Sequence, residues 1–313
     1  MKIILTGQDF ESVEVLSAML SSHPQLDLAD TSFTSIIIGK NGLIDLCRSM
    51  ESCFHVNRSS KKIREFELLA RTLLCHEEIP LLDSFLDDIT AVDYEGMPFC
   101  DRSELSPLKT ILFEKMRRKA KNNKRKPRMG SMYIPTDKLS FRKRTKGFLE
   151  QLMSYRFANS QNLLMVMPET YPAISENSSL LTDSMIVFLN HDPRNLFALN
   201  KQRQDPWLRS DPVHFCKWHI SSMRILSKEV ENLPTLLFVQ YENLIDHPNE
   251  VLNSICRKLE IEYNVLDMGK SGLNRAGSSD FYKTACSNDE VKIINRECTE
   301  LILQAQNAIN YGV

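Results

Sequence analysis

Short apolar runs, several of them followed by a helical pattern, are the feature that most limits the fold of this chain. The first run, Ile3, Ile4 and Leu5, ends at Gly7 and gives way at once to helical spacing. Four further runs have the length of strands, at 35–38, 163–167, 185–190 and 236–240. Three of the five are followed within a few residues by a helix-like segment, an alternation typical of α/β proteins. The sequence therefore predicts an α/β fold, a parallel sheet with flanking helices.

Helical patterns fill most of the remaining chain. They are expected at 61–76, 106–120, 139–156, 212–230 and 247–260, with a closing helix at 288–309. Ser287, Asp289 and Glu290 suit the start of that last helix, because acidic side chains favour a helix N-terminus. Residues 41–156 have an almost wholly helical pattern. We therefore predict a single domain over residues 1–313 with a large helical insertion at about 41–156.

The composition, 42% apolar and 25% charged residues, is that of a globular protein with a full core. No apolar run approaches the roughly 18–20 residues of a membrane span, and the N-terminus has no secretory signal pattern. The eight cysteines contain no CxxC pair, which favours buried thiols in a reducing compartment over disulfides or a zinc site. We therefore expect a cytoplasmic protein without a metal.

The charges are distributed unevenly along the chain. The net charge is −1, yet residues 115–146 hold fourteen Lys or Arg residues and one acid, Asp137. This basic tract has three interpretations: a solvated loop, a surface for a polyanion or protein partner, or a segment that docks on the protein's own acidic body. Few aromatic residues, Tyr133 and Phe141, accompany the basic ones, which favours an acidic glycan or an anionic surface over nucleic acid.

The segment after the first apolar run has the frame of a phosphate-binding loop. Gly7 leads directly into a helical pattern, and the amides at a helix N-terminus offer a site for an anion. The helix is followed by Ser-Ser-His-Pro at 21–24. Farther along, strand-like runs lead into Asn-His-Asp-Pro-Arg at 190–194 and into Tyr-Glu-Asn-Leu at 241–244. These segments together resemble one known family.

That family is the sulfotransferases, which move a sulfuryl group from 3′-phosphoadenosine 5′-phosphosulfate (PAPS) to an acceptor. Residues 7–24, 185–199 and 236–263 are similar to its motifs in order and spacing, and residues 275–283 match weakly the stretch that wraps the donor's 3′-phosphate. The resemblance covers about two-thirds of the chain, and the helical insertion has no counterpart in it. It implies a P-loop-like sulfotransferase fold, with PAPS or its product PAP as the cofactor.

The resemblance also implies a set of site residues. The candidates for donor binding are Gly7, Gln8, Ser12, His191, Arg275 and Gly277. His191 follows a strand end, where sites of open α/β sheets collect, and could meet a phosphate when protonated or act as a base. Glu169 also follows a strand and is a second candidate base. Each has a structural alternative: a turn histidine for His191, a helix cap for Glu169 and a surface loop for Arg275.

Several positions depart from the family's pattern where the donor would bind. The loop positions of the family's base and of its Ser-Gly-Thr-Thr are taken here by Phe10, Glu11, Ser12, Val13 and Glu14. At the 3′-phosphate site, His191 and Leu199 replace an arginine and a serine. Asp192, Pro193 and Arg194 match the family, where they help to build the turn. The departures remove positive charge and hydroxyl donors from the expected anion site.

Asp9, Glu11 and Glu14 make the loop acidic. Two like charges ~4 Å apart at an effective dielectric of ~20 repel by about 4 kcal/mol, so one acid facing the pocket would offset the attraction of the helix end for phosphate. Alternatively, the acids face solvent and interact favourably with the helix dipole. The sequence leaves both orientations open. A metal site built from these acids is disfavoured, because no partner ligand is marked by its spacing.

We interpret the chain as a sulfotransferase-family protein with an eroded PAPS site, non-catalytic or non-canonical, that acts by binding or scaffolding. The alternative is an active PAPS-dependent sulfotransferase that transfers a sulfuryl group to a hydroxyl of a glycan or small molecule. A third hypothesis is a cleft rebuilt for another ligand. Tyr241 and Glu242 are expected to connect the strand at 236–240 to the next helix, a structural role.

Overall fold

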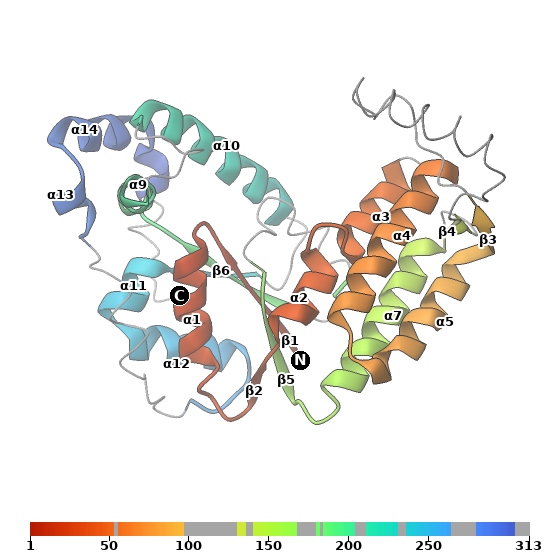
Figure 1. Cartoon of the computed structure of the whole chain (residues 1–313). Helices are drawn as coiled ribbons and strands as arrows, with labels where there is room; N and C mark the ends of the chain where they lie inside the picture. The colour runs from red at the N-terminus through yellow and green to blue at the C-terminus, as the bar shows by residue number, and fades with distance from the viewer. Residues whose placement is uncertain are drawn as a thin grey trace, which may run out of the picture. The chain divides into compact units, whose positions relative to one another are not determined.

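The computed structural model describes residues 1–52, 56–96, 130–135, 140–167, 180–181, 184–203, 211–230, 236–263 and 280–303. The chain divides into two compact units, Met1–Asp30 with Asn159–Val313, and Thr31–Ala158. The first unit contains a central sheet with helices, and the described part of the second is mostly helical (Figure 1).

A five-stranded parallel sheet forms the centre of the first unit. Its strands are β1 (Lys2–Gly7), β2 (Leu26–Leu28), β5 (Asn162–Val166), β6 (Ser184–Asn190) and β7 (Leu236–Gln240). They lie in the order β2-β5-β1-β6-β7, and every neighbouring pair is parallel. A parallel sheet is covered on both faces, which explains why its strands appear as continuous apolar runs. The predicted α/β fold with a parallel sheet and flanking helices is confirmed.

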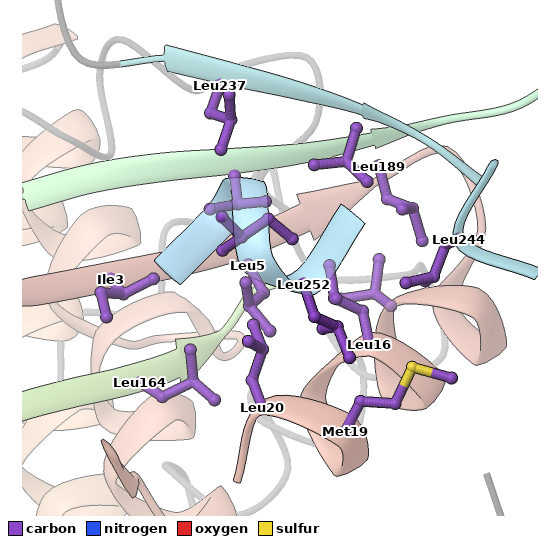
Figure 2. Packing of buried hydrophobic residues seen from close by; sticks show 14 of the residues in the cluster. Ile3, Leu5, Leu16, Met19, Leu20, Leu164, Leu189, Leu237, Leu244 and Leu252 are labelled. Carbon is purple, nitrogen blue, oxygen red and sulfur yellow. The ribbon is translucent and has the colours of Figure 1, made fainter. Parts of the chain in front are cut away.

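Helices lie on both sides of this sheet (Figure 1). One group consists of α1 (Phe10–Leu20), α11 (Tyr241–Asp246) and α12 (Pro248–Lys258). Figure 2 shows the apolar side chains of this group, Leu16 and Leu20 of α1 among them, packed against Leu5 and neighbouring strand residues. These three leucines are fully buried, and truncating one to alanine is expected to cost about 2–5 kcal/mol.

The second group of helices packs around its own apolar cluster. It consists of α9 (Pro193–Gln202), α10 (Pro212–Val230), α13 (Tyr282–Ala285) and α14 (Asn288–Glu297). The buried members of the cluster are Leu196, Phe197, Phe215, Cys216, Ile294, Cys298 and Ile302. Helix α14 begins with a capping box, in which Ser287 accepts a bond from the Glu290 N–H and Glu290 accepts one from the Ser287 N–H at 2.7 Å. The cap confirms the start expected for this helix.

His23 fixes the turn that follows α1. Its Nδ1 accepts a hydrogen bond from the backbone N–H of Gln25 at 3.1 Å, and its Nε2 lies 2.7 Å from the carbonyl oxygen of Glu262. Because Nδ1 is an acceptor, the neutral ring carries its proton on Nε2 and donates to that carbonyl. The Ser-Ser-His-Pro sequence therefore ties the end of α1 to the segment after α12.

The second unit combines helices with one antiparallel hairpin. Its elements are α2 (Thr31–Ile38), α3 (Leu43–Ser52), α4 (Val56–Leu73), η1 (His76–Glu78), α5 (Ile79–Ile89), β3 (Thr90–Gly96), β4 (Gly130–Pro135) and α7 (Phe141–Arg156). The rings of Phe85 and Phe148 stack at 4.5 Å between centroids. A buried ion pair joins Arg156 to Glu78, whose side chain is 1% exposed, with a bond of 2.6 Å from Nε to Oε1.

The prediction of a strand at 35–38 is wrong, because these residues belong to helix α2. Phe33, Ile36 and Ile37 are fully buried, and their spacing of i, i+3 and i+4 places them on one helical face. A short apolar run by itself does not distinguish a buried helix from a strand. Strand β2 and the hairpin β3–β4 were not predicted either; β2 has three residues, two of them exposed, and so lacks an apolar run.

Most of the predicted helices are present with shifted ends. Helices α4, α7, α10 and α12 correspond to the predictions at 61–76, 139–156, 212–230 and 247–260. The closing helix predicted at 288–309 is interrupted at Cys298, where α14 has its C-cap, and residues after 303 lie outside the described part. The helix predicted at 106–120 also lies outside it. None of the helices in the described ranges has the length and apolar character that crossing a membrane requires.

Candidate functional site

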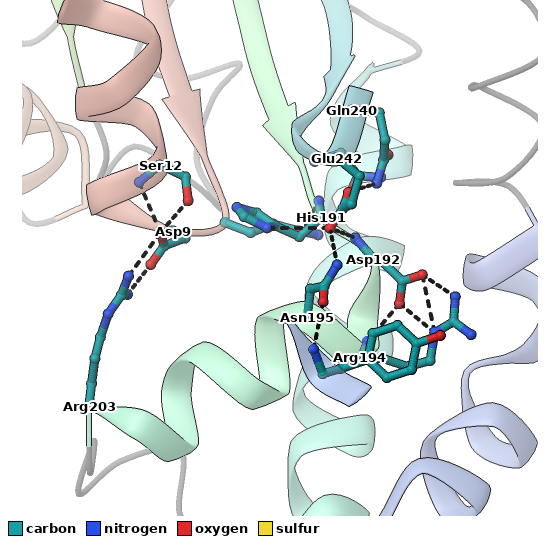
Figure 3. Close-up of polar contacts among 12 residues, drawn as sticks. Asp9, Ser12, His191, Asp192, Arg194, Asn195, Arg203, Gln240 and Glu242 are labelled. Carbon is teal, nitrogen blue, oxygen red and sulfur yellow. Dashed lines mark hydrogen bonds and ion pairs between the residues drawn. The ribbon is translucent and has the colours of Figure 1, made fainter. Parts of the chain in front are cut away.

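The ends of three adjacent strands, β1, β6 and β7, lie at the carboxyl edge of the sheet, where open α/β proteins hold their ligands. The segments at these ends contain residues 7–9, 190–192 and 240–242, and β7 leads directly into α11. Figure 3 shows the polar contacts in this region. The predicted donor-site residues found here are Gly7, Gln8, Ser12 and His191. The fold thus brings together segments that are far apart in the sequence.

Gly7 occupies a position with no room for a side chain. A Cβ there would lie 2.7 Å from the carbonyl oxygen of Leu189 and 2.9 Å from Cγ2 of Val13. Both distances are shorter than real Cβ contacts, so glycine lets β1 approach the end of β6 and the first turn of α1. Close packing therefore accounts for this glycine.

Gln8 connects the first loop to β6 and α10. Its side-chain oxygen accepts the backbone N–H of His191 at 2.9 Å, and its Nε2 donates to Sδ of Met223 at 3.0 Å. Its own backbone N–H donates to the carbonyl of Leu189 at 3.2 Å. Both ends of the Gln8 amide are therefore engaged within the protein.

Asp9 places a carboxylate at the N-terminus of α1. Its backbone is extended (φ −136°, ψ 127°), and its Oδ2 accepts bonds from Ser12 N at 2.9 Å and Ser12 Oγ at 2.5 Å. Arg203, just after α9, pairs with both oxygens, with Nη2 3.3 Å from Oδ2 (Figure 3). A carboxylate of this chain therefore occupies the helix end that holds a phosphate in a phosphate-binding loop.

The surroundings keep Asp9 ionised. Burial raises the pKa of Asp9, but the hydrogen bonds from Arg203 and Ser12 and the positive charge of Arg203 outweigh it. The pKa therefore stays below its ordinary value of 3.8. The loop carries a permanent internal anion at neutral pH.

The two other acids of the loop face solvent. Glu11 has a side chain that is 66% exposed and accepts a bond from Arg203 Nη2 at 2.8 Å, and Glu14 is exposed on the same helix. One guanidinium thus serves the two carboxylates of Asp9 and Glu11, which leaves this cluster with a net negative charge. The two orientations left open by the sequence both occur: Asp9 points inward as a cap, and Glu11 and Glu14 point outward.

Phe10 and Ser12 supply no free ligand for an anion. Phe10, at the position of the family's loop base, is 51% exposed and carries no charge. Ser12 is buried, its N–H and O–H are both directed to Asp9, and its hydroxyl also contacts the phenol of Tyr241. The hydroxyl that could have met a phosphate is therefore already engaged.

His191 is buried behind the loop. Its ring lies 4.4 Å from that of Tyr241, between centroids, and its Nδ1 is 3.9 Å from Oε1 of Glu242. Neither ring nitrogen has a hydrogen-bond partner among the described residues. Burial lowers the pKa of His191, outweighing the attraction of Glu242 and Asp9. His219 of α10 is also buried, and burial lowers its pKa to about 4. Both imidazoles are therefore neutral at neutral pH.

The segment after His191 forms a structural network. The carboxylate of Asp192 accepts bonds from the N–H and Nε of Arg194, each at 2.8 Å, and caps α9. Glu242 Oε1 accepts bonds from the Asp192 N–H at 3.1 Å and from Nδ2 of Asn195 at 2.9 Å. The Arg194 guanidinium lies 4.5 Å from the ring centre of Tyr282. These contacts join the turn between β6 and α9 to α11 and α13, so the buried carboxylate of Glu242 supports the turn.

The remaining candidates are three residues outside the described ranges and Leu199. Glu169, Arg275 and Gly277 lie outside the described residues. Leu199, at the position of the family's serine, is partly buried on α9 and offers no hydroxyl. Among the residues that the structure describes, no group of three His, Cys, Asp or Glu side chains is arranged to hold a metal. Sequence reasoning missed Arg203, which no local motif marks because it reaches Asp9 from a different helix.

A cavity of about 740 Å³ lies beside the carboxyl ends of β6 and β7. It is lined by Asn190 and Gln240 from the strand ends, by α10 and by residues around the end of α14. The Asn190 amide donates to Gln240 at 3.0 Å, and the cavity adjoins Gln8 through Met223. Sites for small molecules typically occupy ~300–1,000 Å³. This cavity is therefore large enough for such a ligand.

In the described part of the basic tract, basic side chains form ion pairs within the second unit. Arg142 donates to both oxygens of Glu51, at 2.7 and 2.9 Å, and Lys146 lies 3.9 Å from Glu150. Residues 115–129, which hold most of the tract's basic side chains, lie outside the described residues. Part of the tract thus forms ion pairs inside its own unit.

No protein-family model matches the chain, and no curated protein matches its sequence. Among solved structures, it is similar to the sulfotransferase domain from the curacin biosynthetic pathway, with 12% identity, a TM-score of 0.45, and coverage of 95% of this chain and 96% of that one. The sulfotransferase domain of the Synechococcus PCC 7002 olefin synthase has 15% identity, a TM-score of 0.41, and coverage of 100% and 95%. Sulfotransferase STF9 from Mycobacterium avium has 11% identity, a TM-score of 0.42, and coverage of 97% and 76%. All three identities and TM-scores are low, and the function proposed below is therefore argued from this chain's own residues.

Proposed function

We propose that this chain is a sulfotransferase-like protein with an eroded donor site, and that it acts by binding a partner and not by ordinary PAPS-dependent transfer. The segments 7–24, 185–199 and 236–263, which resemble the family's motifs, contribute β1, β6 and β7 with the helices that follow them. These strands are neighbours in the sheet, and their loops meet at one edge. That arrangement supports the interpretation that this edge of the sheet derives from a site that bound the sulfuryl donor.

The observation that carries the proposal is the place of the Asp9 carboxylate. A 5′-phosphate at the start of α1 would need the N–H and hydroxyl of Ser12, both of which are directed to Asp9. It would also lie next to a negative charge. At ~4 Å and an effective dielectric of ~20 this repulsion is about 4 kcal/mol, or roughly a thousandfold in affinity. Arg203 offsets part of it but is itself shared between Asp9 and Glu11.

The position that would meet the 3′-phosphate has also lost its positive charge. His191 stands where the family has the arginine that meets the 3′-phosphate, and its side chain is 0% exposed. Burial lowers the pKa of His191, so the ring offers no positive charge at neutral pH. Loss of the cation at both phosphate positions supports a site that no longer holds PAPS or PAP.

For the binding activity we propose the basic tract at 115–146 as the contact surface. Nine of its fourteen Lys and Arg residues fall within 115–129, which gives this stretch a strong attraction for acidic partners. The partner class is an acidic macromolecule, either a polyanion or the acidic face of a protein.

The test of the donor site is a titration with PAP, followed by thermal shift and calorimetry. The unmodified protein should show no stabilisation at millimolar PAP. Asp9→Ser keeps a capping oxygen, removes the charge and releases Arg203, so it should bind PAP at least ~10-fold more tightly. Glu14→Gln removes an exposed acid from the same helix without touching the cap and is the matched control, with no gain expected.

Two outcomes would contradict the proposal. Micromolar PAP binding by the unmodified protein, lost in His191→Ala or Arg275→Ala, would favour the active sulfotransferase acting on a hydroxyl of a glycan or small molecule. Failure of Asp9→Ser to gain affinity would refute the role of the internal carboxylate. For the contact surface, heparin is the probe polyanion: replacing the Lys and Arg residues of 115–129 by Gln should abolish salt-sensitive retention on a heparin column.

A further inference from the structure

Two cysteines from different helices meet in the first unit. Cys216 lies in α10, and Cys298 is the C-cap of α14. Each is 1% exposed, and their thiols lie within hydrogen-bonding reach of each other. Both belong to the same buried cluster, and closeness of the two sulfurs is the first geometric requirement for a disulfide.

The surrounding packing holds this pair in place. Helices α10 and α14 pack against each other, and the apolar cluster around the thiols includes Phe215, Ile294 and Ile302. Cys298 also lines the cavity of about 740 Å³ beside β6 and β7. A small oxidant that enters the cavity therefore reaches the pair from the side of Cys298.

From this geometry we infer that Cys216 and Cys298 are a site of reversible disulfide formation, with a hydroperoxide as the oxidant. The thiolate of one cysteine attacks a peroxide oxygen, the O–O bond breaks, and the departing oxygen takes up the proton that the thiol released. The resulting sulfenic acid is attacked by the second thiol, the S–O bond breaks, and water leaves with the second proton. Two thiols are oxidised to one disulfide, and the hydroperoxide is reduced to water and an alcohol, or to two waters for hydrogen peroxide.

The contact between the two thiols also influences their acidity. The hydrogen bond from Cys298 lowers the pKa of Cys216 against the opposing effect of burial, and the same contact together with burial raises the pKa of Cys298. Because the thiolate is the nucleophile, whichever thiol loses its proton attacks the oxidant, and the other thiol resolves the sulfenic acid. The bridge then fixes the end of α14 to α10 and holds one wall of the cavity. This inference is independent of the fate of the donor site.

The direct test is peptide mapping of the full chain after treatment with one equivalent of hydrogen peroxide. Cleavage by trypsin leaves the two cysteines in separate peptides, 210–217 and 297–313, each with a single cysteine. The expected product is these two peptides joined, with the loss of two hydrogen atoms in mass, and separated again by dithiothreitol. The oxidised protein should also melt roughly 5 °C or more above the reduced one, because the bridge restricts the unfolded chain.

Three variants sharpen the test. Cys216→Ala and Cys298→Ala should each abolish the joined peptides and the rise in Tm. Cys256→Ala removes a buried cysteine of α12 and should leave both unchanged. A disulfide between other cysteines, sulfinic acid at either Cys216 or Cys298 without a bridge, or an oxidised protein with unchanged Tm would overturn the inference. Because the mapping uses the unmodified chain, it remains decisive even if an alanine variant does not fold.

Discussion

The pairing of Asp9 with Arg203 leads to a sharp prediction about stability. Asp9 is buried, caps α1 through Ser12 and is paired with a guanidinium from the end of α9. Asp9→Asn keeps a capping oxygen and removes the charge, whereas Asp9→Ala removes both. The two substitutions therefore separate the cap from the ion pair.

The expected magnitudes follow from these contacts. Loss of an N-cap costs about 1 kcal/mol, and loss of hydrogen bonds to a charged group costs about 1.5–3 kcal/mol. We expect Asp9→Ala to lose about 2–4 kcal/mol and Asp9→Asn about 1–2 kcal/mol, with Tm falling by roughly 2–4 °C for each kcal/mol. Glu11→Gln is the control for the exposed half of the cluster and should change stability by less than about 0.5 kcal/mol.

The measurement is a double-mutant cycle with Asp9→Asn and Arg203→Met, followed by thermal and urea unfolding. A coupling free energy of about 1–2 kcal/mol is expected at neutral pH. Because the folded pKa of Asp9 is depressed, its contribution is present above the ordinary value of 3.8 and is lost as the pH falls through the folded pKa. The gap between the unmodified protein and Asp9→Asn should therefore close in acid. A coupling of zero, or a gap that does not depend on pH, would refute the ion pair.

Three further predictions concern the same fold. Gly7→Ala should lower the Tm by several degrees or prevent folding, because its Cβ would lie 2.7 Å from the Leu189 carbonyl, and an unchanged Tm would show that the strands adjust freely. The free energy of unfolding should fall as the pH drops below about 6.5, because burial holds the pKa of His219 near 4 in the folded protein. His219→Gln should make Tm depend less on pH in this range, and an unchanged pH dependence of Tm would argue against this role of His219. Glu78→Gln should cost about 3–5 kcal/mol in urea unfolding by leaving Arg156 without its buried carboxylate, and a loss below about 1 kcal/mol would contradict that burial.

The local pattern was enough to predict the class of fold, four of the five strands of the sheet and several helices. The apolar runs that became β1, β5, β6 and β7 are each as long as a strand, and only burial on both faces satisfies a strand that is apolar throughout. Helical spacing likewise identified α4, α7, α10 and α12. The run at 35–38 shows the limit of this reasoning, because four apolar residues fit a helix or a strand, and only the packing of α2 in its unit decides.

The sequence predicted which strands lead into Gly7, Gln8 and His191, but not the contacts that these residues make. The order of strands and turns placed Gly7, Gln8 and His191 at one sheet edge, because carboxyl ends of parallel strands share that edge. The spacing of residues along the sequence does not show which side chains lie close together in the folded protein. The inward turn of Asp9 depends on Arg203, which is 194 positions away, and the neutrality of His191 depends on burial by its neighbours. The sequence therefore settled which residues reach the edge of the sheet, and the tertiary structure decided which charges and hydrogen-bonding groups there are already used within the protein.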